Sequence, residues 1–194
     1  MELYLIRHGQ TDWNKAGKLQ GTVDIPLNSF GREAAIKLGN ELDYIKFDRI
    51  YASPLCRAFE TACIIRGRKN VEIVRRPELT ELDFGAGEGT VCSEWLEPSS
   101  PYNCFFTRPA DYIPPEGGET FEHCMERTRS FVQNVLEQLP SDERVMIVAH
   151  GALNKGMMCY LEGNDKAHFW GDGLQDNCCA TIFSYDGTSW KRNN

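Results

Sequence analysis

A long hydrophobic run is missing from this sequence of 194 residues. The apolar stretch at its start, Met1–Ile6, is far too short for a signal peptide or a membrane span, and no basic residues precede it. We therefore expect a protein that stays in the cytoplasm and has no membrane partner.

An excess of positive charge is also missing. The chain has 21 Lys and Arg against 28 Asp and Glu, which gives a formal net charge of −7 and an isoelectric point near 5.2. Nucleic acids and anionic membranes select for clustered basic residues, so neither is expected as a partner. Any binding of an anion must depend on a local group of cations.

Metal-binding and disulfide patterns are absent as well. The four histidines form no H-x-x-x-H cluster, and the eight cysteines form no C-x-x-C pair in a short secreted context. We expect no metal and no cofactor. The cysteines are interpreted as reduced thiols that mostly fill the core; they are Cys56, Cys63, Cys92, Cys104, Cys124, Cys159, Cys178 and Cys179.

Internal repeats are not found, and short strand-like runs alternate with helix-like runs. This alternation predicts an α/β protein with three α/β/α layers around a mostly parallel six-stranded sheet. The Asp186-Gly187 turn predicts an antiparallel edge at the carboxyl terminus. We expect one domain over residues 1–194. The predicted strands are Glu2–Arg7, Arg49–Ala52, Val71–Arg75, Arg144–Ala149, Thr181–Tyr185 and Ser189–Arg192.

Two long helices are predicted from apolar residues at 3.6-residue spacing, one from Ala35 to Ile45 and one from Phe121 to Leu139. Asn28, Ser53 and Thr120 have the side chains that cap helix amino termini. Pro54 suits a first helical turn, and Pro140 should stop the second long helix.

One segment breaks the alternation. Five of the nine prolines lie between Pro98 and Gly118, together with four aromatic residues. This composition predicts a long irregular loop, and the aromatic residues favour a packed lid over a disordered segment. We expect a lid or insertion at about 90–118.

Charged and imidazole side chains follow three of the predicted strands. Arg7 and His8 end the first strand, Arg57 lies just into the helix after the second, and His150 follows the most apolar strand. Open α/β sheets bind ligands at the carboxyl ends of their strands, so these groups are expected to meet. Two guanidinium groups and a neutral imidazole suit phosphoryl transfer through a phosphohistidine.

The leaving oxygen of a phosphate ester also needs a proton. Glu81 lies beside an apolar stretch, where desolvation would raise the pKa of a carboxyl group. Asp83 is the rival acid, and the pKa argument alone does not separate two carboxyl groups this close together. His123 and His168 belong to no such pattern and are interpreted as exposed or structural residues.

The sequence resembles the histidine phosphatase superfamily, in its phosphoglycerate mutase-like branch. The motifs that carry the resemblance occur in family order over most of the chain. They are Arg7-His8-Gly9-Gln10-Thr11 with Asn14, Gln20-Gly21, Ser53-Pro54-Leu55 with Arg57-Ala58, Glu81 with Glu88-Gly89, Gly117-Gly118-Glu119-Thr120, and Val148-Ala149-His150-Gly151.

The resemblance implies roles for these residues. His8 would be the phosphorylated nucleophile, Glu81 the proton donor and acceptor, and Arg7, Arg57 and His150 would hold the phosphoryl group. The substrate pocket would be lined by Asn14, Gln20, Gly21 and Gly151. Three positions depart from the family pattern: Gly87 replaces a usual Trp, Ala152 a Gly, and Lys155 an Arg.

Three functions remain open: a phosphatase acting on small-molecule phosphate monoesters, a phosphoglycerate mutase, and a phosphate-binding protein without activity. The last is disfavoured because no catalytic group is missing. Arg108 is the only Lys or Arg between Thr90 and Phe121, and a lid so poor in cations suits a neutral or aromatic leaving group. A phosphatase is therefore favoured, resembling broad-specificity or α-ribazole-type enzymes. It could be a monomer or a homodimer.

Overall fold

A computed structural model describes residues 1–193 of the chain. Six strands form one sheet in the order β3-β2-β4-β1-β5-β6. Strands β1 to β4 are parallel, whereas β5 runs antiparallel to β1 and β6 antiparallel to β5. The expected mostly parallel sheet with an antiparallel edge is confirmed. The strands are β1 Glu2–Arg7, β2 Arg49–Ala52, β3 Ile73–Arg75, β4 Arg144–Ala149, β5 Ala180–Tyr185 and β6 Trp190–Arg192.

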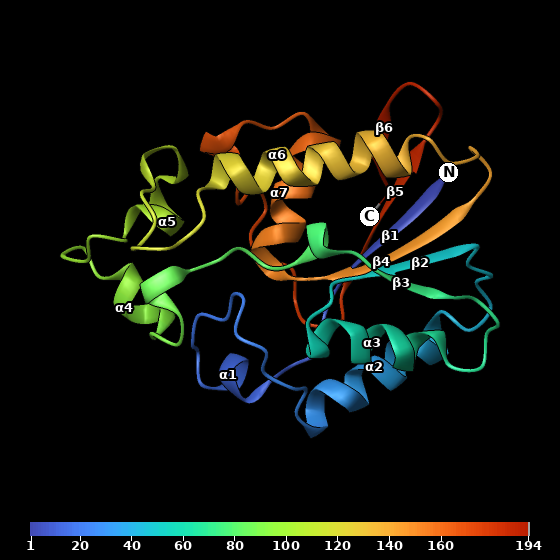
Figure 1. Ribbon diagram of the computed structural model, residues 1–194, viewed down its shortest axis with the longest axis horizontal. Coiled ribbons are helices and arrows are strands. Elements are labelled where there is room, and N and C mark those ends of the chain that lie inside the picture. The colour runs from blue at the N-terminus through green and yellow to red at the C-terminus, as the bar shows by residue number, and fades with distance from the viewer. Residues whose placement is uncertain (194) are drawn as a thin grey trace.

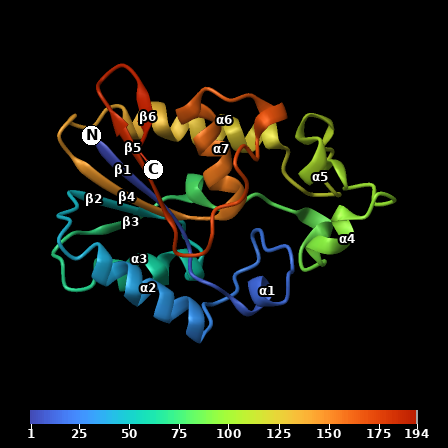
Figure 2. The ribbon, with the colours of Figure 1, turned by 180° about the vertical axis from the view of Figure 1, so that it is seen from behind.

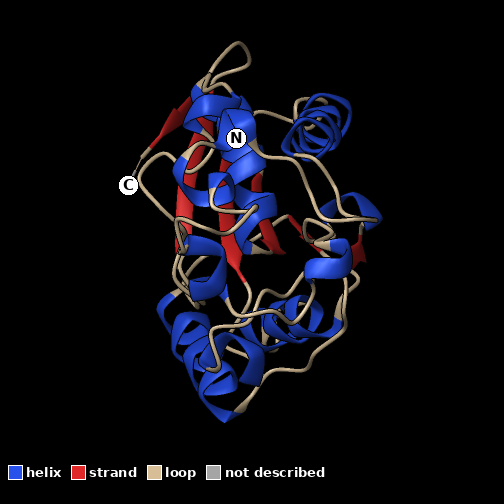
Figure 3. Cartoon of the chain, turned by 90° about the vertical axis from the view of Figure 1, so that its left-hand side faces the viewer, coloured by secondary structure: helices blue, strands red, loops and turns tan. Residues whose placement is uncertain are grey.

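Helices cover both faces of this sheet (Figures 1 and 2). Helices α2 and α3 pack together on one face, and α6 and α7 pack together on the other. Figure 3 shows the strands between these two helical layers, which confirms the three-layer α/β/α architecture. The helices are α1 Asp12–Lys15, α2 Ser29–Glu41, α3 Cys56–Arg66, α4 Cys92–Leu96, α5 Cys104–Thr107, α6 Phe121–Phe131 and α7 Gly151–Glu162.

Two hydrophobic cores follow from the alternation of side chains along the strands. In β1, Leu3 and Leu5 face the core under α6 and α7, whereas Tyr4 and Ile6 face the core over α2 and α3. Strand β4 divides in the same way. Its residues Val145–Ala149 are all fully buried, because helices cover a central parallel strand on both faces. The strand is therefore apolar at every one of these positions.

Two of the three predicted helix caps are confirmed. Asn28 caps α2 by accepting from the Gly31 N–H, and Thr120 caps α6 by accepting from the His123 N–H. The prediction for Ser53 was wrong, because α3 begins at Cys56 with Leu55 at its cap position.

The predicted extents of the two long helices also need correction. Helix α2 ends at Glu41, so Ile45 lies outside it although its side chain is buried. Helix α6 ends at Phe131 and continues as a π-helical turn over Val132–Leu136 before Pro140. A π turn shifts the register of side chains by one residue relative to an α-helix.

Residues 90–118 lie beyond the carboxyl ends of β1 and β4, on the same side as α1 (Figures 1 and 2). The prediction of an irregular loop over Pro98–Gly118 was wrong in part, because this stretch contains α5 and a 3₁₀ turn at Pro109–Asp111. Trp95, Phe105 and Tyr112 are buried in the core shared with α6 and α7. The aromatic residues therefore pack this segment against the body of the protein.

Within residues 1–193, no helix combines the length and the apolar character needed to cross a membrane.

Candidate active site

The carboxyl ends of three parallel strands converge on one place. Arg7 is in register with Ala149, and Ala52 with Val148. The ladder continues one residue further, because the His8 N–H donates to the Ala149 carbonyl and the Ser53 N–H to the Val148 carbonyl, each at 3.0 Å. The residues that follow the strands are therefore fixed by sheet hydrogen bonds.

His8 is a buried imidazole with one free nitrogen. Its Nδ1 lies 2.7 Å from the carbonyl oxygen of Gly9, which is an acceptor only, so the proton belongs on Nδ1 and the lone pair on Nε2. Burial, followed by the charges of Arg57 and Arg7, holds the pKa of His8 well below its ordinary value. The imidazole is therefore neutral near pH 7, as a nucleophile requires.

The loop that carries His8 is held from several sides. The Gly9 N–H donates to Thr61 Oγ1 at 3.0 Å, and the Asn177 side chain donates to the His8 carbonyl at 2.8 Å. Gly9 also packs directly on the start of α2, since a methyl group added to it would lie 2.6 Å from the carbonyl oxygen of Gly31. Neither glycine leaves room for a side chain.

Arg57 lies behind His8 and is fully buried. Its two terminal nitrogens donate to the carbonyls of Val23 and Gly21, at 2.9 and 2.7 Å. Glu88 holds that same loop, because its carboxylate accepts from the N–H groups of Gly21 and Thr22. Burial lowers the pKa of Arg57 to about 10, which still leaves the guanidinium charged at neutral pH.

Arg7 supplies a second guanidinium, which donates to the carbonyl of Gln175. The Nε atoms of Arg7 and Arg57 are both buried and have no hydrogen-bond partner among the described residues. Buried donors of this kind are costly unless they are satisfied. A bound oxyanion would supply the missing acceptor.

His150 contacts the hydroxyl group of Ser53 through Nε2 at 2.7 Å. The Ser53 oxygen also accepts from the Leu55 N–H, so its own proton can be donated to Nε2. That arrangement leaves the imidazole proton on Nδ1, which is buried and has no partner in the described structure. Burial, then the charges of Arg57 and His8, keep the pKa of His150 well below its ordinary value.

Glu81 has a buried carboxyl group that contacts the amino-terminal N–H groups of α7. Its Oε1 accepts from the N–H groups of Leu82 and Leu153 at 2.9 and 2.8 Å, whereas its Oε2 accepts only from Ala152 at 3.1 Å. Burial raises its pKa, and the three backbone N–H groups and Arg57 oppose that increase. The carboxyl group can therefore exist in both protonation states, and Oε2 is the oxygen with room for a proton.

A cavity of about 420 Å³ opens in front of these groups. Arg7, His8 and Glu81 lie on its polar floor. The remaining lining is mostly apolar and comes from α1 and the loop after it, Phe84, α4, α5, the start of α7 and the segment after α7. Its apolar residues are Leu19, Phe84, Leu96, Phe105, Phe106, Trp170 and Leu174. A larger groove of about 510 Å³, between α6 and α7, contains none of the groups described above.

The residues expected to bind substrate are only partly at the cavity. Asn14, Gln20 and Gly151 line it, but Gly21 does not. Gly21 instead uses its backbone to hold Arg57 and Glu88. The expected phosphate ligands Arg57 and His150 are fully buried and are not among the residues that line the cavity.

The segment from Trp170 to Asn177 was not anticipated from the sequence. Besides its lining residues, it contributes Gln175, whose side chain is buried and donates to the Leu5 carbonyl and Thr181 Oγ1. Its Oε1 accepts from Asn154. The sequence did offer one signal. A polar, glycine-containing run connects a helix to the strand that pairs with β1, and this connection must pass the end of β1.

Asp83, the rival acid, and the two remaining histidines lie outside the cavity. Asp83 caps the Gly85 N–H at 2.8 Å and does not line the cavity. His123 and His168 have side chains 71% and 73% exposed, as expected. The eight cysteines are free, as expected, but the expectation that they mostly fill the core was wrong. Cys124 and Cys159 are buried, five others are partly exposed and Cys179 is exposed.

Two of the three departures from the family pattern have local explanations. A methyl group on Gly87 would lie 2.5 Å from the Trp95 ring, so helix α4 already fills the space beside this position. Ala152 supplies to Glu81 the same backbone N–H that a glycine would supply, so the structure does not explain this departure. Lys155 is buried and paired with Asp172 at 2.8 Å.

The donor set suits an anion rather than a metal. Within residues 1–193, no three His, Cys, Asp or Glu side chains are grouped so that they could hold a metal ion.

Comparisons with known proteins show the family of this chain. Residues 3–193 match the family model of the histidine phosphatase superfamily (branch 1). The chain belongs to this superfamily, and it is a phosphatase.

Three relatives illustrate the relationship. Phosphoserine phosphatase 1 of Hydrogenobacter thermophilus is 30% identical over 182 residues, covering 94% of this chain and 85% of the relative. The structure of Bacillus stearothermophilus YhfR has a TM-score of 0.89 at 33% identity, covering 98% and 94% of the two chains. The Entamoeba histolytica phosphoserine phosphatase in complex with 3-phosphoglyceric acid has a TM-score of 0.86 at 27% identity, covering 100% and 95%.

Proposed function

We propose that this phosphatase hydrolyses small-molecule phosphate monoesters through a covalent phosphohistidine on His8, with Glu81 as the general acid and base. The observation that carries this proposal is the buried, neutral His8. Its Nδ1 is engaged by its own backbone, and its Nε2 is free beside two guanidinium groups. Those positive charges oppose protonation of the nucleophile and attract the phosphoryl group that it attacks.

In the first step, Nε2 of His8 attacks phosphorus and forms a P–N bond while the P–O bond of the ester breaks. The leaving oxygen takes a proton from Oε2 of Glu81 and departs as an alcohol. Negative charge on the transferring oxygens is stabilised by Arg7, Arg57 and the Nδ1–H of His150, whose free donors are the buried unpaired atoms described above.

In the second step, Glu81 is a carboxylate and accepts a proton from water. The resulting hydroxide attacks phosphorus, the P–N bond breaks, and inorganic phosphate is released. His8 returns to its neutral form, and Glu81 returns to its protonated form. The cycle needs no metal and no cofactor, because each charge and each proton is supplied by this chain.

The substrate is proposed to be a monoester with a neutral or aromatic leaving group. Phe105, Phe106 and Trp170 give the cavity a large apolar wall that would contact the leaving group. Arg108 adds no charge to the cavity, since its side chain is 72% exposed and pairs with Asp111. Lys18 is the one lysine among the cavity residues.

A phosphoglycerate mutase is the alternative activity. A mutase must hold a small polyanion through its phosphate and its carboxylate, which favours several cations around the phosphoryl pocket. The apolar wall supports hydrolysis over this alternative.

Rapid-quench labelling tests the proposal. Mixing the protein with a ³²P-labelled ester should yield a protein-bound phosphate that is labile in acid and stable in base, and His8→Ala should remove both label and turnover. Full turnover by His8→Ala would contradict the proposal. A phosphate-release screen over aryl phosphates, phosphoserine and 3-phosphoglycerate, run beside an isomerisation assay with bisphosphoglycerate, separates the two activities.

A further inference from the structure

The backbone segment that carries Glu81 has little regular structure of its own. A 3₁₀ turn at Pro77–Leu79 precedes it, and another at Gly85–Gly87 follows it. Leu79 and Leu82 anchor it by burying their side chains completely. Apolar anchors resist removal of the segment from the core, but they do not fix its position along the cavity wall, because hydrophobic contacts are not directional.

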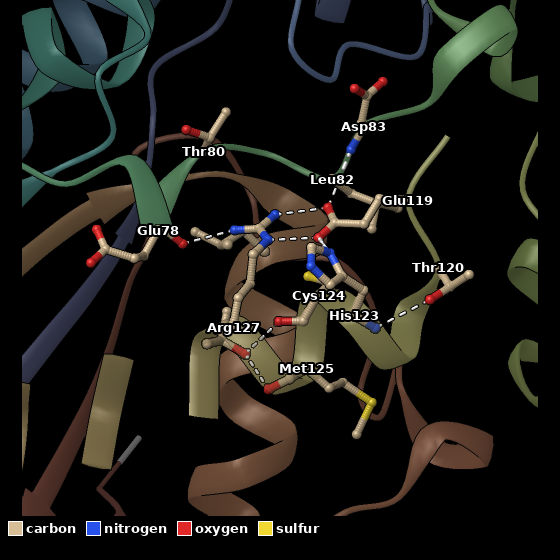
Figure 4. A network of polar contacts seen from close by, with 12 residues as sticks. Glu78, Thr80, Leu82, Asp83, Glu119, Thr120, His123, Cys124, Met125 and Arg127 are labelled. Atoms are coloured by element: carbon tan, nitrogen blue, oxygen red, sulfur yellow. Dashed lines mark hydrogen bonds and ion pairs between the residues drawn. The ribbon is translucent and has the colours of Figure 1, made fainter. Parts of the chain in front are cut away.

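Directional contacts come from an ion pair between Arg127 on α6 and Glu119, the residue before the Thr120 cap of that helix (Figure 4). Arg127 donates to both carboxylate oxygens of Glu119, from Nε at 2.7 Å and from NH2 at 2.9 Å. Its remaining nitrogen, NH1, donates to the backbone carbonyl of Glu78 at 2.7 Å. Arg127 therefore holds the start of the segment, three residues before Glu81.

Glu119 holds the other end. Its backbone N–H donates to the carbonyl of Asp83 at 2.7 Å, and its Oε2 accepts from the Asp83 N–H at 3.4 Å. The two residues of the ion pair thus bind backbone groups of Glu78 and Asp83 (Figure 4). These residues lie on either side of Glu81 in the sequence. The paired side chains are only 18% and 9% exposed, so water competes little for these contacts.

We propose that the Arg127–Glu119 ion pair is a positioning device for Glu81, which fixes the 78–83 segment so that the carboxyl group faces both the N-terminal N–H groups of α7 and the leaving oxygen. This inference rests on the proposed role of Glu81 as general acid. Neither Arg127 nor Glu119 lines the cavity, so both act through Glu81 and not on the substrate.

The geometry explains why this position needs an arginine. One guanidinium group makes two parallel bonds to the Glu119 carboxylate and still has a nitrogen left for the Glu78 carbonyl. A lysine ammonium is a single donor centre and does not reproduce this planar fork.

The test compares two esters with an aromatic ring but different leaving groups. Benzyl phosphate releases an alkoxide that needs a proton, whereas p-nitrophenyl phosphate releases a stabilised phenolate that does not. The readout is the ratio of kcat/KM for the two esters, because kcat/KM reports on steps up to release of the leaving group. Glu81→Gln removes the general acid completely, so it should change this ratio more than any other variant, by about 10²–10⁴-fold.

Arg127→Met should lower kcat/KM for benzyl phosphate about 10–100-fold more than for p-nitrophenyl phosphate, because a displaced general acid is inefficient. Arg127→Lys should recover part of the ratio. If Arg127→Met folds poorly because the buried Glu119 keeps only its contact with the exposed His123, the double variant Glu119→Gln/Arg127→Met removes both charges and is measured instead. Arg129→Gln is the matched control, since Arg129 makes an exposed pair with Glu126 on the same helix.

The outcomes separate the two proposals. If Glu81→Gln leaves the ratio unchanged, the proposed role of Glu81 fails, and the positioning role fails with it. If Glu81→Gln changes the ratio but the Arg127 variants lower both esters equally, the ion pair is only structural and the inference is overturned. A changed ratio in Arg127→Met, with no further change when Arg127→Met is added to Glu81→Gln, supports it.

Discussion

The imidazole rings of His8 and His150 lie with their centroids 5.1 Å apart and their planes at 59°. Both side chains are buried beside Arg57. A proton on either ring would place a charge next to another cation without water to screen it. The pair therefore persists only while both rings are neutral.

The stability of the protein should consequently depend on these two histidines in mildly acidic solution. Their pKa values are lowered in the folded state, so below a pH of about 6.5 the unfolded chain binds more protons than the folded one. The stabilisation is present above that pH and is lost as the pH falls. We expect His8→Gln to show a smaller decrease in Tm between pH 7.5 and pH 5.5 than the wild-type protein.

Glu81 acts in the opposite direction, because its folded-state pKa is raised and its contribution is lost as the pH rises. The comparison between His8→Gln and the wild-type protein cancels this contribution, since both retain Glu81. Thermal unfolding at several pH values provides the measurement. An identical pH dependence for the two proteins would contradict the burial of a neutral His8.

Ser53 should be important for catalysis although it does not line the cavity. Its hydroxyl group is the only partner of His150 Nε2 among the hydrogen bonds of the described residues. Ser53→Ala should leave a buried nitrogen unsatisfied, at a cost of about 1–3 kcal/mol in unfolding free energy. We also expect kcat to fall about tenfold, since the orientation of the imidazole is lost. Ser130→Ala, on the exposed face of α6, should change neither quantity.

Glu88 should control the affinity for oxyanions through Arg57. Its carboxylate holds the Gly21–Thr22 backbone, and the carbonyl of Gly21 holds the guanidinium. We expect Glu88→Ala to weaken inhibition by vanadate about 10–100-fold, as expected when a charge-assisted contact worth about 1.5–3 kcal/mol is lost. The exposed Glu94 offers the control variant Glu94→Ala. Unchanged vanadate inhibition in Glu88→Ala would show that the Gly21–Thr22 loop holds Arg57 without the Glu88 carboxylate.

The apolar wall should set the preference for leaving groups. Phe106 and Trp170 stack with centroids 5.7 Å apart and planes at 27°. Phe106→Ala should raise KM for p-nitrophenyl phosphate about 5–20-fold, because an aromatic contact worth about 1–2 kcal/mol is removed. KM for glycerol phosphate should change much less. Phe30→Ala, at an exposed position on α2, is the control. Equal effects on both esters would argue against contact between the wall and the leaving group.

The strands and the polar residues at their carboxyl ends could be predicted from the sequence because local signals and tertiary position agree there. Val145–Ala149 is a continuous apolar run, which is typical of a parallel strand buried on both faces. His8, Arg57 and His150 follow such strands, so the topology alone brings them to one edge.

The predictions that failed concern residues whose environment depends on distant parts of the chain. Ser53 has the side chain of a helix cap, but its hydroxyl group contacts His150 instead. Helix α5 forms within a proline-rich segment because Phe105 is buried among other aromatic rings. Local propensity contains no information on such partners.

The Trp170–Asn177 segment was missed for a related reason. It has neither helical nor strand periodicity, and its contribution lies in backbone and amide contacts such as that of Gln175 with Arg7. Residues of this kind are recognised only once the end of β1 and the start of β5 are seen side by side.

The contact between Gly9 and Gly31 has a consequence for mutational tolerance. Neither position lines the cavity, yet a methyl group at either one would meet backbone atoms at 2.6 Å or less. A saturation screen that selects for activity should therefore find both positions as intolerant as His8, the proposed nucleophile. Compensation by a second substitution is excluded, because each glycine is opposed by main-chain atoms that every amino acid shares. Intolerance to substitution would thus identify a steric boundary here, not a chemical role.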